Sequence, residues 1–136
     1  MVLPGIQALF GFQLIAVFSA GFEQSLNKAQ QELHLFAILL VAVAIALIMT
    51  PAALHRAGGA REVTSTFIAV SSALLLASMA PLAIGICVEV YLVAAVLTNS
   101  EIARIFAVTL FLLFIGLWFV FPRIERLQRL VARTRG

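Results

Sequence analysis

The chain has 136 residues, of which 63% are hydrophobic and 11% are charged, and its formal net charge is +3. Soluble domains carry about 25% charged residues, so this composition excludes a water-soluble globular protein. Four long apolar runs, separated by short polar joints, leave no room for a soluble catalytic domain. The sequence therefore predicts a single transmembrane domain over residues 1–136.

The first apolar run covers about residues 3–22 and matches the about 20 residues that cross a hydrocarbon core of about 30 Å. It is longer than the apolar part of a secretory signal, and no Lys or Arg precedes it. We therefore expect a permanent span rather than a signal peptide. Gln7 and Gln13 lie in this run, and we interpret them as polar groups that hydrogen bond between packed helices.

The second run covers about residues 33–54, with His34 and His55 at its two ends. A pair of haem or chlorophyll ligands is one interpretation, but the other runs lack the partner histidines that a bis-histidine haem needs. We favour ordinary interfacial histidines and expect no cofactor. The single cysteine, Cys87, is expected to be a small apolar filler, and no metal-ligand spacing surrounds it.

The third run, about residues 63–97, would form a helix of about 52 Å at 1.5 Å per residue, longer than the membrane core. It is too short for two crossings and a turn, so we expect one long helix, kinked at Pro81. A stripe of small and polar residues follows one face of this helix. Its members are Thr64, Ser71, Ser78, Gly85 and, one turn later, Glu89.

This stripe allows two interpretations, a seam where helices pack closely or a polar lining for water and ions. Glu89 is the only ionisable residue well inside any of the runs. Ionisable groups in hydrocarbon usually face the protein interior and often mark an ion or proton path. Glu89 also lies nearer one end of an overlong helix, so reaching the lipid headgroups is the alternative.

The fourth run covers about residues 105–121, and Thr98 followed by Glu101 predicts a capping box at its start. Trp118 near its end is either an interfacial anchor or a ring packed against a neighbouring helix. The tail, residues 122–136, places apolar residues on one helical face and arginines on another, which predicts a short basic helix on the inner leaflet. A plain positive-inside stop signal is the alternative. The residues expected to bind anionic headgroups are Arg123, Arg126, Arg129 and Arg133.

The basic residues also predict the orientation, because short cytoplasmic loops are enriched in Lys and Arg. The joint between the second and third runs holds Arg56 and Arg61, and the tail holds most of the remaining arginines. The other joints are less basic. Four crossings with both termini in the cytoplasm satisfy every joint.

The segment LPGIQALFGFQL at residues 3–14, with PAALHR at residues 51–56, resembles an uncharacterised family of small bacterial four-helix membrane proteins. Members are sometimes labelled sodium:proton antiporters. The resemblance covers about the first two helices and implies a bacterial inner-membrane location, without an established role. Known cation antiporters use many more helices and paired acidic residues, whereas this chain offers one Glu within its runs.

Together these patterns predict an all-α membrane protein, a bundle of four transmembrane helices. The chain has no Asp and no Ser-His-Asp or phosphate-cradling pattern, so we do not expect an enzyme. The favoured function is an oligomeric channel- or transporter-like protein for protons or small cations. Glu89 would titrate, and Ser71, Ser78, Gly85 and Pro81 would shape the path. The alternative is a non-transporting accessory subunit of a larger membrane complex; nucleic acid is not an expected partner.

Overall fold

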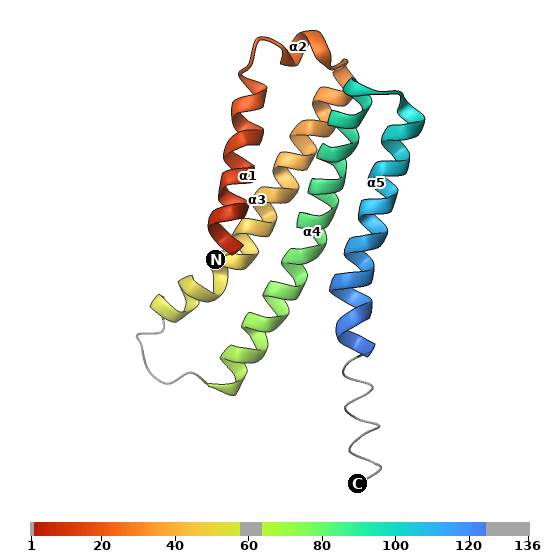
Figure 1. The fold of residues 1–136 in the computed structure, drawn as a ribbon. Coiled ribbons are helices and arrows are strands. Elements are labelled where there is room, and N and C mark those ends of the chain that lie inside the picture. Colours follow the sequence, from red (N-terminus) through yellow and green to blue (C-terminus); the bar gives the residue numbers. More distant parts are fainter. Residues whose placement is uncertain (1, 58–63, 125–136) are drawn as a thin grey trace.

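The computed structural model describes residues 2–57 and 64–124, and every element in these two ranges is a helix. The chain runs up and down through long helices that pack in the order α1, α3, α4, α5 (Figure 1). The short helix α2 lies at the end of the bundle where α3 begins and α4 ends (Figure 1). The elements are α1 (Val2–Val17), α2 (Phe22–Ser25), α3 (Lys28–Ala57), α4 (Ser65–Leu97) and α5 (Ser100–Ile115), which continues into a π-helical turn (Gly116–Val120).

Three helices are long and apolar enough to cross a membrane, over Lys28–Arg56, Ser65–Leu97 and Ser100–Ile124. This confirms the helical, membrane-like character that the composition predicts. Helix α1 has 16 residues and is about 24 Å long at 1.5 Å per residue. It ends five residues before the predicted boundary at residue 22 and covers only part of the length of α3 (Figure 1).

The third apolar run forms one helix, α4, of 33 residues that continues through Pro81. The prediction of a single helix in place of a hairpin is confirmed, and the kink at Pro81 stays a prediction. Thr64 caps the start of α4, where its hydroxyl oxygen accepts a hydrogen bond from the backbone N–H of Phe67 at 3.2 Å.

The start of α5 differs from the predicted capping box. Asn99, not Thr98, is the N-cap residue, and its side-chain oxygen accepts a hydrogen bond from the N–H of Ile102 at 2.9 Å. The hydroxyl of Thr98 instead donates to the carbonyl of Ala94 at 2.6 Å, at the end of α4. The prediction was wrong by one residue because α4 and α5 are joined so tightly that Thr98 serves the preceding helix.

Helices α3 and α4 share the most extensive contact in the described part of the chain. Ala37, Val41 and Ala44 of α3 are fully buried. A Cβ atom added to Gly85 of α4 would lie 3.1 Å from Val41 Cγ2 and 3.3 Å from the carbonyl oxygen of Ala37. Gly85 therefore allows the two helix backbones to approach closely, as small residues do between membrane helices.

A hydrophobic cluster extends this contact to α1 and to the π-helical turn after α5. Ile6, Val41, Ala44 and Leu82 form its buried centre, and Trp118 packs against it from outside. The ring of Trp118 also lies 4.5 Å from that of Phe114, centroid to centroid. The structure thus favours the helix-packing interpretation of Trp118.

The basic tail falls mostly outside the described residues. Arg123 is exposed in the last helical turn of the described residues, after the π-helical turn. The predicted headgroup-binding residues Arg126, Arg129 and Arg133, and the predicted interfacial helix, lie beyond residue 124.

Candidate functional site

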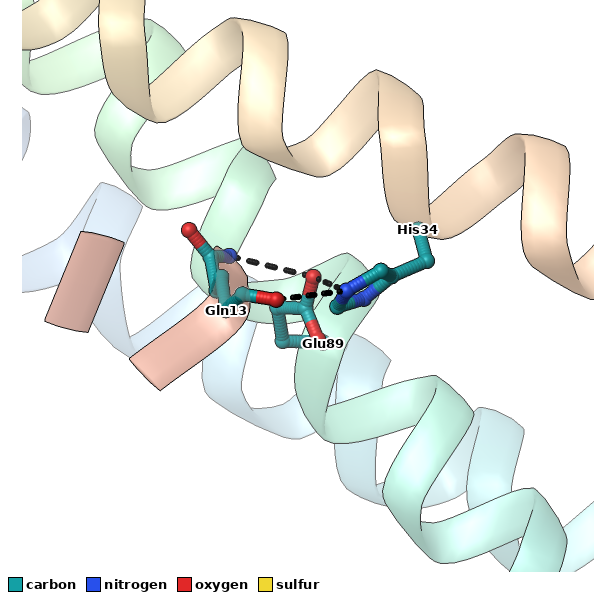
Figure 2. A network of polar contacts seen from close by, with 3 residues as sticks. All are labelled: Gln13, His34 and Glu89. Carbon is teal, nitrogen blue, oxygen red and sulfur yellow. Dashed lines mark hydrogen bonds and ion pairs between the residues drawn. The ribbon is translucent and has the colours of Figure 1, made fainter. Parts of the chain in front are cut away.

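Three polar side chains from three different helices meet inside the bundle (Figure 2). Gln13 comes from α1, His34 from α3 and Glu89 from α4. His34 Nδ1 lies 2.8 Å from Glu89 Oε1, and the side-chain amide of Gln13 donates to the same oxygen at 3.0 Å. His34 Nε2 lies 3.2 Å from the backbone carbonyl oxygen of Gln13. We refer to these three residues as the Gln13–His34–Glu89 cluster.

The cluster is enclosed by protein. Gln13 and His34 are each 4% exposed, and the side chain of Glu89 is 17% exposed. Glu89 therefore faces the neighbouring helices and a histidine. In hydrocarbon, ionisable groups are tolerated when they pair in this way.

The contacts of His34 determine how many protons the pair holds. A carbonyl oxygen can only accept, so His34 Nε2 must carry the hydrogen that points at Gln13. One more proton then lies between His34 Nδ1 and Glu89 Oε1, either on the nitrogen as an ion pair or on the oxygen as a neutral pair. In both forms the two side chains carry no net charge, and loss of that proton leaves a net charge of about −1.

The cluster lies toward the end of the bundle that contains α2 and the α4–α5 connection. His34 follows the start of α3 at Lys28 by six residues, about 9 Å at 1.5 Å per residue. Glu89 precedes the end of α4 at Leu97 by eight residues, about 12 Å. Because α3 and α4 are antiparallel neighbours, the two side chains reach the same depth.

A cleft of about 370 Å³ lies at this end of the bundle, and His34 and Glu89 are among its lining residues. One wall comes from the end of α1, the connection after it and α2, and the opposite wall from the last turns of α4. The ring of Phe22, on the α2 wall of the cleft, lies 5.2 Å from that of His34, centroid to centroid. The lining residues are Ala16, Ser19, Gly21, Phe22, Ser25, Leu26, His34, Glu89, Leu92, Val93, Val96 and Leu97.

Toward the opposite end of the bundle, the cluster is followed by close packing. Gly85 lies one turn from Glu89 on α4, in contact with Val41 and Ala37. Beyond it, Leu82 joins the hydrophobic cluster. The cleft thus ends at the Gln13–His34–Glu89 cluster, and apolar side chains fill the space behind it.

The residues singled out in the sequence are not all brought together. Ser78 is buried, and its hydroxyl donates to the carbonyl of Leu75 within its own helix at 2.6 Å. The hydroxyl oxygen of Ser71 is buried without a hydrogen-bond partner among the described residues. Gly85 packs against α3, and Pro81 is half-buried on α4. This part of the stripe does not line the cleft.

Gln7, Gln13 and Thr64, predicted to be polar packing groups, also lie in different places. Gln13 is buried in the cluster and connects α1 to α4, as expected of a packing group. Gln7 is exposed on α1, and Thr64 is exposed at the start of α4. Cys87 is buried, which agrees with its interpretation as a filler.

Sequence reasoning missed His34 as the partner of Glu89. The available signal was depth: in antiparallel neighbouring helices, a residue near the start of one and a residue near the end of the other lie at the same level. His34 and Glu89 satisfy this condition. The described residues contain no group of three or more His, Cys, Asp or Glu side chains that could hold a metal ion.

Comparison with known proteins identifies the family of the chain. No curated protein and no solved structure matches the chain. The model of a family of unknown function, DUF6328, matches residues 1–122. This confirms the uncharacterised family that the sequence resemblance indicates, and the chain belongs to the family of unknown function DUF6328.

Proposed function

We propose that this protein is a transporter-like membrane protein that binds and releases protons at the pair formed by His34 and Glu89. The observation that carries the proposal is the buried pair itself, with His34 Nδ1 2.8 Å from Glu89 Oε1 at the base of an open cleft. Paired ionisable residues at membrane depth are typical of proton relays. Gln13 holds the carboxylate in place through its amide.

The packing favours a mechanism that alternates between states over a permanently open pore. The cleft gives the pair access to one end of the molecule, while Gly85, Val41 and Leu82 close the way to the other. A proton taken up from the cleft therefore needs a rearrangement of α1 or α4 before it can leave on the other side, as in other transporters with a central site.

The sequence pattern supports a membrane, an orientation and an oligomeric state for this transporter-like protein. In a bacterial inner membrane, four crossings with both termini in the cytoplasm place Arg56 inside, and the cleft then opens to the outer side. Anionic headgroups attract the arginines of the tail. Assembly into a homo-oligomer supplies helices that one small bundle lacks.

The test is proton flux into liposomes that contain the purified protein. We expect wild-type protein to carry protons above empty liposomes, and Glu89→Gln to lose the flux because the amide keeps the shape but does not titrate. Glu101→Gln is the matched control, since Glu101 is exposed and pairs locally with Arg104. Equal flux in wild-type protein and Glu89→Gln, with both proteins folded, would refute the proposal.

A second candidate, a non-transporting accessory subunit, is favoured by the packing of α4. Ser78 and Gly85 serve contacts within and between helices instead of a path. Much of α5 is exposed, including Ile105, Phe106 and Leu112, which offers an apolar face to lipid or to another protein. A monomer that copurifies with one larger membrane complex, and shows no flux, would favour this candidate. A homo-oligomer of defined size with flux would exclude it.

A further inference from the structure

The cleft above the Gln13–His34–Glu89 cluster combines apolar walls, an aromatic ring and a carboxylate. Leu92, Val93 and Val96 line its α4 side, and the Phe22 ring lines it beside His34. Its volume of about 370 Å³ lies within the about 300–1,000 Å³ of sites that bind small molecules. These walls would bind the apolar body of a ligand.

The charge of the cluster depends on the shared proton. With the proton between His34 Nδ1 and Glu89 Oε1, the pair is neutral. When the proton leaves to solvent, the carboxylate faces a neutral imidazole, and an uncompensated negative charge in an apolar surrounding is costly. A singly charged cation in the cleft would restore neutrality.

From these observations we infer that the cleft binds a monovalent organic cation with an apolar body, an alkylated or arylated ammonium or phosphonium, in exchange for the proton shared by His34 and Glu89. One cation enters, one proton goes to water, and the charge of the site stays balanced. The exchange rests on the proposed proton binding at this pair and names the substrate class that would be coupled to it.

The wall chemistry distinguishes this class from an alkali ion. A dehydrated alkali ion needs a shell of oxygen ligands to replace its water, whereas most residues that line the cleft present carbon atoms. Phe22 fits an organic cation, because the face of an aromatic ring attracts quaternary ammonium groups. Glu89 supplies the opposite charge beside it.

The experiment measures binding of tetraphenylphosphonium to the purified protein in detergent by equilibrium dialysis, with empty micelles as the blank. Tetraphenylborate, which has nearly the same shape and the opposite charge, is the ligand control. We expect the phosphonium to bind and the borate not to bind. Equal protein-dependent binding of both ions would overturn the inference, because it would show an apolar surface without charge selection.

Two variants test the residues. We expect Glu89→Gln to weaken phosphonium binding about thirtyfold or more, since the opposite charge is lost. Phe22→Leu keeps the apolar volume but removes the ring and should weaken binding about threefold to tenfold. The matched controls are Glu101→Gln and Phe18→Leu; both residues are exposed and neither lines the cleft. Unchanged binding in both Phe22→Leu and a folded Glu89→Gln would refute the site.

Proton release separates this inference from the proposed function. In weakly buffered solution, phosphonium binding should acidify the medium by about one proton per bound cation, and binding without acidification would overturn the exchange. If liposome proton flux depends on Glu89 but the phosphonium does not bind, the inference fails and the proposed function stands. If binding releases a proton but no flux occurs, the site stands and transport fails.

Discussion

At the scale of single residues, the most consequential feature is that His34 Nδ1 lies 2.8 Å from Glu89 Oε1 inside the bundle. Gln13 supports both partners, since its carbonyl accepts from the imidazole and its amide donates to the carboxylate. Neither charged partner is easily accommodated alone, because a single buried charge without its counterpart is strongly unfavourable. We therefore expect the pair to behave as one unit in stability.

This unit predicts a coupled effect of two substitutions. His34→Leu should lower the free energy of unfolding by about 1–3 kcal/mol, because Glu89 loses its partner while it stays enclosed. Glu89→Leu should have a comparable effect. The double variant should cost clearly less than the sum, because no polar group is then left unpaired. Reversible unfolding in mixed micelles gives the free energy of unfolding of the wild-type protein, the two single variants and the double variant. Strictly additive effects would contradict the conclusion that His34 and Glu89 act as one unit.

For single residues, the sequence indicates which side chains are unusual better than it indicates which side chains they contact. The isolation of Glu89 in an apolar run marks it without a structure, and the need of Gln13 for a hydrogen bond in lipid is equally visible. Their meeting with His34 depends on which helices are neighbours and how they are rotated. One sequence does not contain that information, and so the sequence alone favours an interfacial role for His34.

At the scale of the elements, the contact between α3 and α4 holds the site together, because it sets His34 and Glu89 at one depth. The close approach depends on Gly85, where a Cβ would meet Val41 Cγ2 and the carbonyl oxygen of Ala37. A side chain can shift by a few tenths of an ångström, but a backbone carbonyl in the middle of a helix does so less easily.

Gly85→Ala is therefore expected to reduce the free energy of unfolding by about 1–3 kcal/mol through overpacking. Gly11→Ala is the matched control, since nothing lies within 4 Å of its added Cβ. Alanine is the better helix former by about 0.5–1 kcal/mol, so that variant should be neutral or slightly more stable. Thermal unfolding of both variants measures the difference. Equal stability of the two would show that α3 and α4 are not in such close contact.

The start of α5 gives a second prediction at this scale. Asn99→Ala removes the side-chain oxygen that accepts from the N–H of Ile102, and should lower stability by about 1 kcal/mol, as loss of an N-cap does. Thr98→Ala removes a hydroxyl that bonds a carbonyl at the end of α4, and should cost less. Thermal unfolding ranks the two variants. A larger effect at Thr98 would favour the capping box predicted from the sequence.

The elements themselves follow from hydropathy, but their ends do not. Helix α3 begins at Lys28, before the second apolar run, because a helix continues into polar residues beyond the hydrocarbon. Helix α1 ends at Val17, although the apolar run extends to residue 22. There the N–H and hydroxyl of Ser19 both bond the carbonyl of Ala16 and form a turn. Hydropathy indicates burial in lipid but does not predict such local hydrogen bonds.

At the scale of the whole molecule, the two ends of the bundle differ in charge and in structure. The end with α2 and the α4–α5 connection (Figure 1) carries the cleft. Glu101, in the first turn of α5, pairs with Arg104. The opposite end carries His55 and Arg56 in the last turn of α3. If α3 and α4 cross the membrane, these two ends lie on opposite sides, and the positive-inside rule predicts that the basic end lies in the cytoplasm.

Cysteine labelling tests this topology directly. In a Cys87→Ala background, Ser25→Cys in α2 and Thr98→Cys between α4 and α5 should react with a membrane-impermeant maleimide in intact bacterial spheroplasts. Arg56→Cys should react only after the membrane is broken, because positive residues stay inside. All three positions are exposed, so burial within the protein does not explain a missing reaction. The Cys87→Ala protein alone is the blank.

Each pattern of labelling has a distinct meaning. Reaction at Thr98→Cys and protection at Arg56→Cys would place the cleft, with His34 and Glu89 at its base, on the outer side, where protons and organic cations would reach the pair from outside the cell. The reverse pattern would keep both crossings and invert the direction of access. Reaction of both in intact spheroplasts would mean that α4 does not cross, and would remove the transmembrane barrier on which the proposed proton transfer depends.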